Sequence, residues 1–331
     1  MTDKRKLGPF TLGPIGLGCM SLSHAYGAPP EATHGARLLN HALDIGYDFI
    51  DSAALYGFGA NEALIGEAIG ARRAEYVLAS KCGMTGIDGK RVVDGRPETL
   101  LRTLDESLAR LRTDVIDLYY LHRWDKRMPI EESVGALGRM VESGKVRAIG
   151  LSEVSAATLR KAHAVHPIAA VQNEYSPWSR NVELGVLETA KELGIALVAF
   201  SPTARGFLAG RVRSADDMGE GDLRRSMPRF QGENLKRNLA LYERFSRLAE
   251  EVGCTPAQLS LAWLLTRGDH VVPIPGTTSL RHLEENLAAG DFGLAPDVIE
   301  EIDSLLEPAA IAGARYPAAA QADVDTEEFE H

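Results

Sequence analysis

The chain has 331 residues, of which 45% are hydrophobic and 25% are charged, as in soluble globular proteins. Its formal net charge of −10 argues against a nucleic-acid binder, which would normally show a basic face. No apolar run approaches the roughly 20 residues that span a bilayer, and residues 1–10 lack the apolar core of a signal peptide. Cys19, Cys82 and Cys254 are widely separated and suggest neither a disulfide framework nor a metal site, so we expect a cytoplasmic location.

Short apolar runs alternate with longer segments of helical periodicity along the chain. The runs are 15–19, 47–51, 76–81, 115–122, 146–152, 169–173, 195–200 and 270–275. The helical segments are 32–46, 61–73, 97–112, 129–144, 155–166, 183–194, 255–268 and 279–290. Continuous apolar runs are typical of parallel strands buried on both faces. The alternation predicts an α/β protein, a (β/α)8 TIM barrel. The alternative, a doubly wound sheet, lacks its usual GxGxxG motif after the first run.

Several segments exceed eight plain units of a strand and a helix. Residues 207–235 are polar and rich in glycine, and a loop of this length is typically a lid or a binding loop. Extra helices are predicted at 236–253 and 296–307, and the pattern Thr255, Pro256 and Gln258 predicts a capping box. Residues 313–331 form an acidic C-terminal tail that we expect to be solvated, with Tyr316 as a possible cover of the active site. We see no domain boundary and expect one domain over 1–331.

Polar side chains occur where the apolar runs end, and barrel enzymes carry their active sites at that end of the strands. Asp51, Lys81 and His122 end three successive runs, and Tyr56 follows Asp51 in the motif DSAALYG. Strand ends converge in a barrel, so charged groups there must pair or stay hydrated.

These four residue types suit proton transfer to a carbonyl oxygen. A nearby ammonium favours the phenolate and so lowers the pKa of a tyrosine, while an aspartate keeps that ammonium charged. A histidine can bond a substrate oxygen or share the proton. We therefore predict that Asp51, Tyr56, Lys81 and His122 form one acid–base unit. Such a unit supplies no electrons, so carbonyl reduction would need a nicotinamide cofactor.

The motifs around these residues resemble those of the aldo-keto reductase superfamily, specifically its bacterial and plant branch of broad aldehyde and ketone reductases. They are GLGCM, DSAALYG with NEALIG, LASK, DVIDLYYLHRWD, GKVRAIGLSE, AVQNEYS, VAFSP and PIPGTTSLRHLEEN, from about Gly13 to Asn286. The resemblance implies a (β/α)8 barrel that reduces an aldehyde or ketone to an alcohol with NADPH. It also implies that Tyr56 is the proton donor, with Asp51, Lys81 and His122 as its partners, and that no metal takes part.

The resemblance further implies a set of cofactor contacts. Positions that hold the nicotinamide are matched by Ser152, Glu153, Gln172 and Phe200. Positions along the pyrophosphate are matched by Ser201, Thr203 and Gly206. The adenosine-phosphate end is matched by Gly276, Thr277, Arg281, Glu285 and Asn286. Many members carry a lysine where this chain has Gly276, and only Arg281 offers a guanidinium for a 2′-phosphate there, so NADPH is favoured only moderately and NADH stays possible.

Substrate and partners are less constrained by the sequence. Candidate substrate-pocket residues are Met20 and Tyr26, in a wall that could include Leu22 and His24, together with Trp124 and Trp178. No basic pocket for an anionic substrate is evident, although arginines 123, 180, 224, 225 and 229 lie in candidate loops. We expect a small carbonyl substrate, no nucleic acid and no membrane, and the oligomeric state is open. Two alternatives are an NAD-linked alcohol dehydrogenase on the same site and a nicotinamide-binding regulatory subunit with little turnover.

Overall fold

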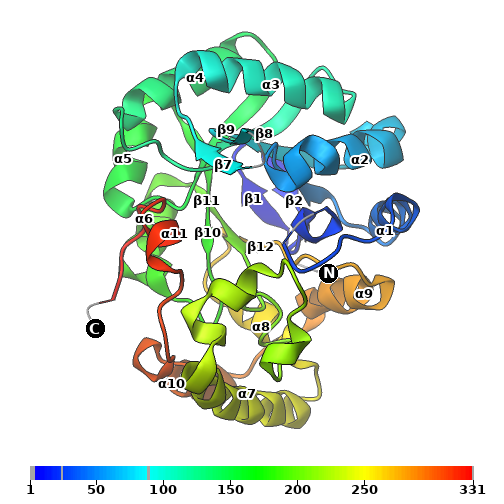
Figure 1. The fold of residues 1–331 in the computed structure, drawn as a ribbon, viewed down its shortest axis with the longest axis vertical. Coiled ribbons are helices and arrows are strands. Elements are labelled where there is room, and N and C mark those ends of the chain that lie inside the picture. The colour runs from blue at the N-terminus through cyan, green and yellow to red at the C-terminus, as the bar shows by residue number, and fades with distance from the viewer. Residues whose placement is uncertain (1–3, 24, 88–89, 330–331) are drawn as a thin grey trace.

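The computed structural model describes residues 4–23, 25–87 and 90–329, and its centre is an eight-stranded parallel sheet (Figure 1). In sheet order the strands are β12 (Val271–Pro273), β11 (Ala196–Phe200), β10 (Ile168–Glu174), β9 (Val146–Ser152), β8 (Ile116–Leu121), β5 (Val77–Cys82), β4 (Phe49–Asp51) and β3 (Leu17–Gly18). The outer strands meet, since Gly16 N donates to Pro273 O at 3.0 Å and Gly18 N donates to Pro275 O at 3.2 Å. The predicted barrel is confirmed, and every predicted run overlaps a strand.

Helices surround the sheet, and one follows each of its strands along the chain (Figure 1). They are α1 (Ala32–Asp44), α2 (Ala60–Ile69), α3 (Pro97–Leu111), α4 (Ile130–Glu142), α5 (Ala156–Val165), α6 (Val186–Leu193), α8 (Pro256–Leu265) and α9 (Leu280–Ala288). The two extra helices are also confirmed, as α7 (Gly232–Val252) and α10 (Pro296–Leu305), which lie side by side. The predicted capping box begins α8, because the Thr255 and Gln258 side chains each accept a hydrogen bond from the other's backbone N–H.

The strands read as unbroken apolar runs because both faces of the sheet are buried. On β8, Leu118 and Tyr120 point into the barrel, while Tyr119 and Leu121 pack in the layer between sheet and helices. Each large apolar side chain buried in this way contributes about 1.5–3 kcal/mol relative to exposure. Each strand is covered by the barrel interior on one face and by helices on the other, and this is why apolar runs alternate with helical segments in the sequence.

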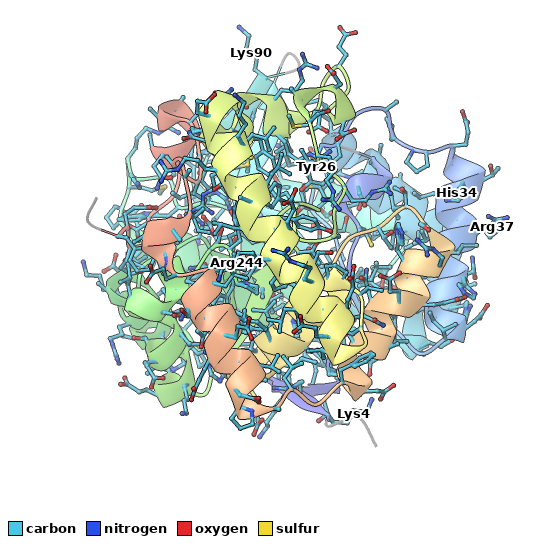
Figure 2. All side chains as sticks on the ribbon, turned by 90° about the horizontal axis from the view of Figure 1, so that it is seen from below. Lys4, Tyr26, His34, Arg37, Lys90 and Arg244 are labelled. Atoms are coloured by element: carbon cyan, nitrogen blue, oxygen red, sulfur yellow. The ribbon has the colours of Figure 1, made fainter. Side chains whose placement is uncertain are left out.

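Two antiparallel hairpins were not predicted. The strands β1 (Arg5–Leu7) and β2 (Phe10–Leu12) form the first, and their Leu7 and Leu12 join the core inside the barrel. The strands β6 (Met84–Ile87) and β7 (Lys90–Val93) form the second, directly after β5. Figure 2 shows Lys4, next to the first hairpin, and Lys90, on the second, at opposite ends of the molecule. Strands of three or four residues give too few alternations for a period of two to be recognised.

The acidic tail contradicts the expectation of a solvated segment. Arg315, Tyr316 and Val324 are buried, and the tail contains the short helix α11 (Ala318–Gln321). The Arg315 guanidinium lies 2.9 Å from a carboxylate oxygen of Glu153, at the end of β9. The tail is acidic as a whole, but one basic residue and several apolar residues within it attach the segment to the barrel, which its net charge does not reveal. No helix among the described residues is long and apolar enough to cross a membrane.

The close approach of α2 to the end of α3 yields a stability prediction. Gly66 of α2 faces the end of α3, where an added Cβ would lie 2.7 Å from Leu111 C and 2.8 Å from Leu111 O. Gly66→Ala should therefore lower the free energy of unfolding by about 1–3 kcal/mol, because backbone cannot move aside easily. Urea unfolding followed by circular dichroism would measure the change.

Gly70, at the end of the same helix, is the matched control. It has αR backbone angles and nothing within 4 Å of an added Cβ. Gly70→Ala should stay within about 0.5 kcal/mol of the parent protein or stabilise it slightly. Equal effects at the two positions would show that the contact between α2 and α3 is not the cause.

Candidate active site

A cavity of about 800 Å³ opens at the carboxyl ends of the strands. Its walls come from strand ends, from the loop that follows β11, from the residues before α9 and from the C-terminal tail. This volume is in the usual range of small-molecule and cofactor sites, about 300–1,000 Å³.

The floor of the cavity holds a completely buried lysine with three hydrogen-bond partners. Lys81 Nζ donates to Asp51 Oδ1 at 2.5 Å, to the backbone oxygen of Ser52 at 2.7 Å and to the Tyr56 hydroxyl at 3.2 Å. All three donors of the ammonium are therefore used. The second oxygen of Asp51 accepts a 2.8 Å bond from the amide of Gln172. The structure thus brings three of the four predicted acid–base residues into one hydrogen-bonded group.

Burial and ion pairing have opposite effects on the pKa values of Lys81 and Tyr56. Burial alone would lower the pKa of Lys81, but Asp51 and Tyr56 raise it above its ordinary value, so the ammonium stays charged. For Tyr56, burial raises the pKa and Lys81 pulls it down only in part. The net pKa of Tyr56 therefore lies above its ordinary value: Lys81 lowers it as expected, but burial, which the sequence did not reveal, raises it by more. The physical reason is that desolvation of a phenolate outweighs one ammonium that is already shared with a carboxylate.

His122 completes the predicted set from the other side of the phenol. Its ring meets the Tyr56 ring edge-to-face, with centroids 5.8 Å apart and an interplanar angle of 84°. Burial, together with the charges of Arg123 and Lys81, holds the pKa of His122 well below its ordinary value. Its Nδ1 is buried and has no hydrogen-bond partner among the described residues. His122 is therefore a neutral imidazole that can bond a ligand oxygen without bringing a charge.

Left-handed backbone positions gather around the cavity. Directly after Tyr56, Gly57, Phe58 and Gly59 have φ of 58°, 52° and 95°, which turns the chain sharply into α2. Further non-glycine residues with φ near 50–57° are Glu153, Ser201, Ala204 and Arg205, just after β9 and β11. Such strained residues persist only where surrounding structure holds them, and they concentrate at functional sites.

Most of the residues predicted to bind a cofactor line this cavity. They are Ser152, Gln172, Phe200, Ser201, Thr203, Gly206, Gly276, Thr277, Glu285 and Asn286. Glu153 does not, because its buried carboxylate accepts a 2.8 Å bond from Glu174 N and pairs with Arg315. Arg281 does not either, since it lies on the exposed side of α9 with its guanidinium 3.1 Å from His282 Nε2.

Two of the four predicted substrate-pocket residues line the cavity. Met20 and Tyr26 do, and Figure 2 shows Tyr26 toward the same end of the molecule as Lys90. Trp124 instead donates a 2.9 Å bond to Met128 O and packs on the outer core. Trp178 is buried against Phe207, with ring centroids 4.3 Å apart. Both tryptophans stabilise folded-back loops, which sequence position alone does not reveal. Leu22 is buried in the core, and His24 lies outside the described residues.

The cavity has a basic lining that was not evident in the sequence, and the tail contributes to its wall at the suggested Tyr316. The lining arginines are Arg91, Arg123, Arg205, Arg211 and Arg224, of which the sequence had placed Arg123 and Arg224 in candidate loops. Tyr316, Pro317 and Ala320 line the cavity from the tail. Arg205 donates a 3.0 Å bond to the Tyr316 hydroxyl and a 2.8 Å bond to Glu174. The sequence shows that residues 207–235 are rich in arginine, but it does not show which of these side chains face the cavity.

Comparison with known proteins agrees with this geometry. The family model described as aldo/keto reductase family matches residues 14–307. The chain is 46% identical over 320 residues to the Schizosaccharomyces pombe protein named aldo-keto reductase yakc, NADP(+), covering 95% of this chain and 94% of that protein.

Solved structures show the same similarity. A glycerol dehydrogenase of Gluconobacter oxydans, AKR11B4, superposes with a TM-score of 0.84 at 28% identity, covering 93% of this chain and 97% of that one. The holo form of aldo-keto reductase AKR11C1 from Bacillus halodurans gives 0.79 at 26% identity, covering 96% and 99%. A thermostable aldo-keto reductase, Tm1743, in complex with the inhibitor epalrestat gives 0.72 at 30% identity, covering 92% and 99%.

The buried neutral histidine predicts a pH dependence of stability. The pKa of His122 is lowered on folding, so below about pH 6.5 the unfolded chain binds a proton that the folded protein does not. Stability should therefore fall as pH drops below that value, by up to about 1.4 kcal/mol per pH unit from this residue. His122→Asn should flatten this part of the profile, measured as melting temperature between pH 5 and 8. Parallel profiles for parent and variant would contradict a neutral buried imidazole.

Proposed function

The chain belongs to the aldo/keto reductase family, and we propose that it is an NADPH-dependent enzyme that reduces an aldehyde or ketone with Tyr56 as the proton donor. The observation that carries this proposal is the single ammonium of Lys81, which bonds both Asp51 and Tyr56 at the floor of the cavity. The NADP(+) in the name of the yakc relative supports the choice of cofactor.

In this proposal the chain's own residues transfer one proton, from the Tyr56 hydroxyl to the carbonyl oxygen of the substrate. The raised pKa of Tyr56 keeps the phenol protonated until negative charge develops on the carbonyl oxygen. The proton then moves to that oxygen, and the phenolate left behind is stabilised by Lys81, 3.2 Å away. Asp51 offsets the lysine charge, so the ammonium remains in place before and after the transfer. The N–H of neutral His122 donates one further hydrogen bond to the same oxygen.

When bound, NADPH supplies the hydride that the protein's own side chains cannot supply. The cavity fits such a group in size and in donor chemistry, with hydroxyls on one wall and the amino-terminal end of α9 on another. We assign Ser152, Gln172 and Phe200 to the nicotinamide end. Hydroxyls of Ser201 and Thr203, with the backbone at Gly206, are assigned to the pyrophosphate, and Gly276, Thr277, Glu285 and Asn286 to the adenosine end.

The 2′-phosphate end departs from the sequence expectation. Arg281 lies outside the lining, whereas Arg211 lines the cavity near His282 of α9. Burial lowers the pKa of His282, and the charges of both Arg211 and Arg281 lower it further, but of these two arginines only Arg211 is part of the cavity wall. We therefore assign the 2′-phosphate to Arg211, beside Thr277 and the start of α9.

We further propose that residues 207–235 act as a binding loop and that the enzyme works in the cytoplasm. Support for the loop comes from Arg211, Leu223 and Arg224, which line the cavity from within it. Cys19, Cys82 and Cys254 are free thiols, which suits a reducing compartment.

Arg211→Ala tests the cofactor assignment. Loss of the guanidinium should weaken NADPH binding by about tenfold or more and leave NADH binding nearly unchanged, because NADH has no 2′-phosphate. Titration of each nucleotide against intrinsic fluorescence measures both affinities. Arg281→Ala is the matched control, and a larger loss of NADPH affinity in that variant would reverse the assignment. An NAD-linked alcohol dehydrogenase would instead bind NADH at least as tightly in the parent protein.

Tyr56→Phe tests the proton donor. The rate of NADPH oxidation with any accepted carbonyl should fall by about 10²–10⁴, while NADPH binding persists. Tyr76→Phe is the control, since Tyr76 is also a buried phenol but is not part of the cavity wall, and its hydroxyl donates to Ile69 O at 3.4 Å. Full activity in Tyr56→Phe would refute the assigned role. Tight NADPH binding with negligible turnover of every carbonyl in the parent protein would favour a regulatory subunit.

A further inference from the structure

Two of the arginines that line the cavity have no carboxylate partner among the residues that the structure describes. They are Arg123 and Arg211. The other arginines of the lining are each paired with a carboxylate, namely Arg91 with Asp323, Arg205 with Glu174 and Arg224 with Asp222. A guanidinium that faces a cavity without a counter-ion is suited to an anionic ligand.

Arg123 follows His122 directly after β8 and uses only part of its hydrogen-bonding capacity. Its Nη1 donates to His122 O at 2.6 Å and to Ser152 Oγ at 3.3 Å, which fixes the guanidinium between the ends of β8 and β9. Within the described part of the chain, Nε and Nη2 have no partner, and neither is a buried unsatisfied atom. These two nitrogens form one edge of the guanidinium fork, the edge that can take both oxygens of a carboxylate.

The charge of Arg123 acts on the reacting residues themselves. It opposes protonation of His122, and it partly offsets the effect of burial on the pKa of Tyr56. Lys81 is balanced by Asp51, and His122 is neutral. Arg123 is therefore an uncompensated positive charge beside the reaction centre, where low dielectric strengthens its attraction for an anion.

We propose that the carbonyl substrate of this enzyme carries a carboxylate, which Arg123 binds through its free edge while the carbonyl faces Tyr56 and His122. The inference rests on the proposed reductase function and names its substrate class, aldehyde acids and oxo acids. The substrate's apolar body would lie against Tyr26, Met84 and Tyr316, which also line the cavity. The carbonyl carbon takes the hydride of NADPH, its oxygen takes the Tyr56 proton, and the carboxylate is unchanged. The single positive charge of Arg123 balances a monoanionic carboxylate, whereas a dianionic phosphate would keep one uncompensated negative charge.

A matched pair of aldehydes tests the proposal. Para-carboxybenzaldehyde and its neutral methyl ester present the same aldehyde on the same ring, and NADPH oxidation gives kcat/KM for each. The parent enzyme should prefer the acid, and added salt should reduce the preference. In Arg123→Met the ratio of acid to ester should fall on the order of tenfold to a hundredfold, mainly through a higher KM for the acid. Arg123→Lys, which keeps the charge and loses the fork, should recover part of it.

Arg211→Met is the control, because it removes the other uncompensated guanidinium of the same cavity. Weaker NADPH binding in this variant should lower the rates with both aldehydes alike, so at saturating NADPH the acid-to-ester ratio should stay that of the parent enzyme. Melting temperature shows whether each variant is folded, and fluorescence titration shows whether Arg123→Met still binds NADPH.

Three outcomes would overturn the inference. A parent enzyme that prefers the ester would exclude a carboxylate site while leaving the reductase function intact. An equal loss for acid and ester in Arg123→Met, together with weakened NADPH binding, would assign Arg123 to the cofactor. Failure of the parent enzyme to reduce any carbonyl, despite binding NADPH, would refute the proposed function and the inference with it.

Discussion

The buried Lys81–Asp51 ion pair is the constraint on which the arrangement of the site depends. A charged lysine without exposed surface is tolerated only when each of its donors has a partner. Asp51 comes from the adjacent strand, and Tyr56 comes from the loop that follows it. Backbone pairing of β4 with β5 sets the distance between Asp51 and Lys81, so the register of two strands fixes the position of one phenol. Removing either charge would leave the other buried without an opposite charge, which typically costs several kcal/mol.

This constraint also explains the local strain around the cavity. The chain must leave β4, present Tyr56 to a lysine on the next strand and enter α2 within a few residues. Three consecutive left-handed residues accomplish the turn, and one of them is Phe58, for which this conformation is unfavourable. The ion pair and the packing of α2 on α3 hold that conformation. Stability from the rigid barrel is thus used to keep a strained loop in place.

A second buried ionic network joins the tail to the barrel. It includes Glu153, which the family resemblance had suggested as a cofactor contact. Glu153 and Glu174 lie at the ends of neighbouring strands. Arg315 of the tail pairs with both carboxylates, and Arg205 of the loop after β11 pairs with Glu174. Arg91 of the β6–β7 hairpin pairs with Asp323 of the tail on the other side. Segments distant in sequence are therefore connected over the cavity by arginine–carboxylate pairs, which suit buried pairing because the guanidinium forms several bonds in fixed directions.

The sequence by itself determined the barrel, its helices and the convergence of Asp51, Tyr56, Lys81 and His122, the four residues proposed as the acid–base unit. Periodicity reports burial on both faces, and the polar ends of apolar runs must meet once the strands are parallel and the sheet is closed. It could not determine which side chains of the long loop and tail face the cavity, because that direction depends on contacts between distant segments. Glu153, Arg281, Trp124 and Trp178 were predicted as ligand contacts, yet the tertiary structure directs them to an ion pair, to solvent or into the core. Arg123 shows the converse, since only the folded structure leaves one edge of its guanidinium open beside Tyr56 and His122.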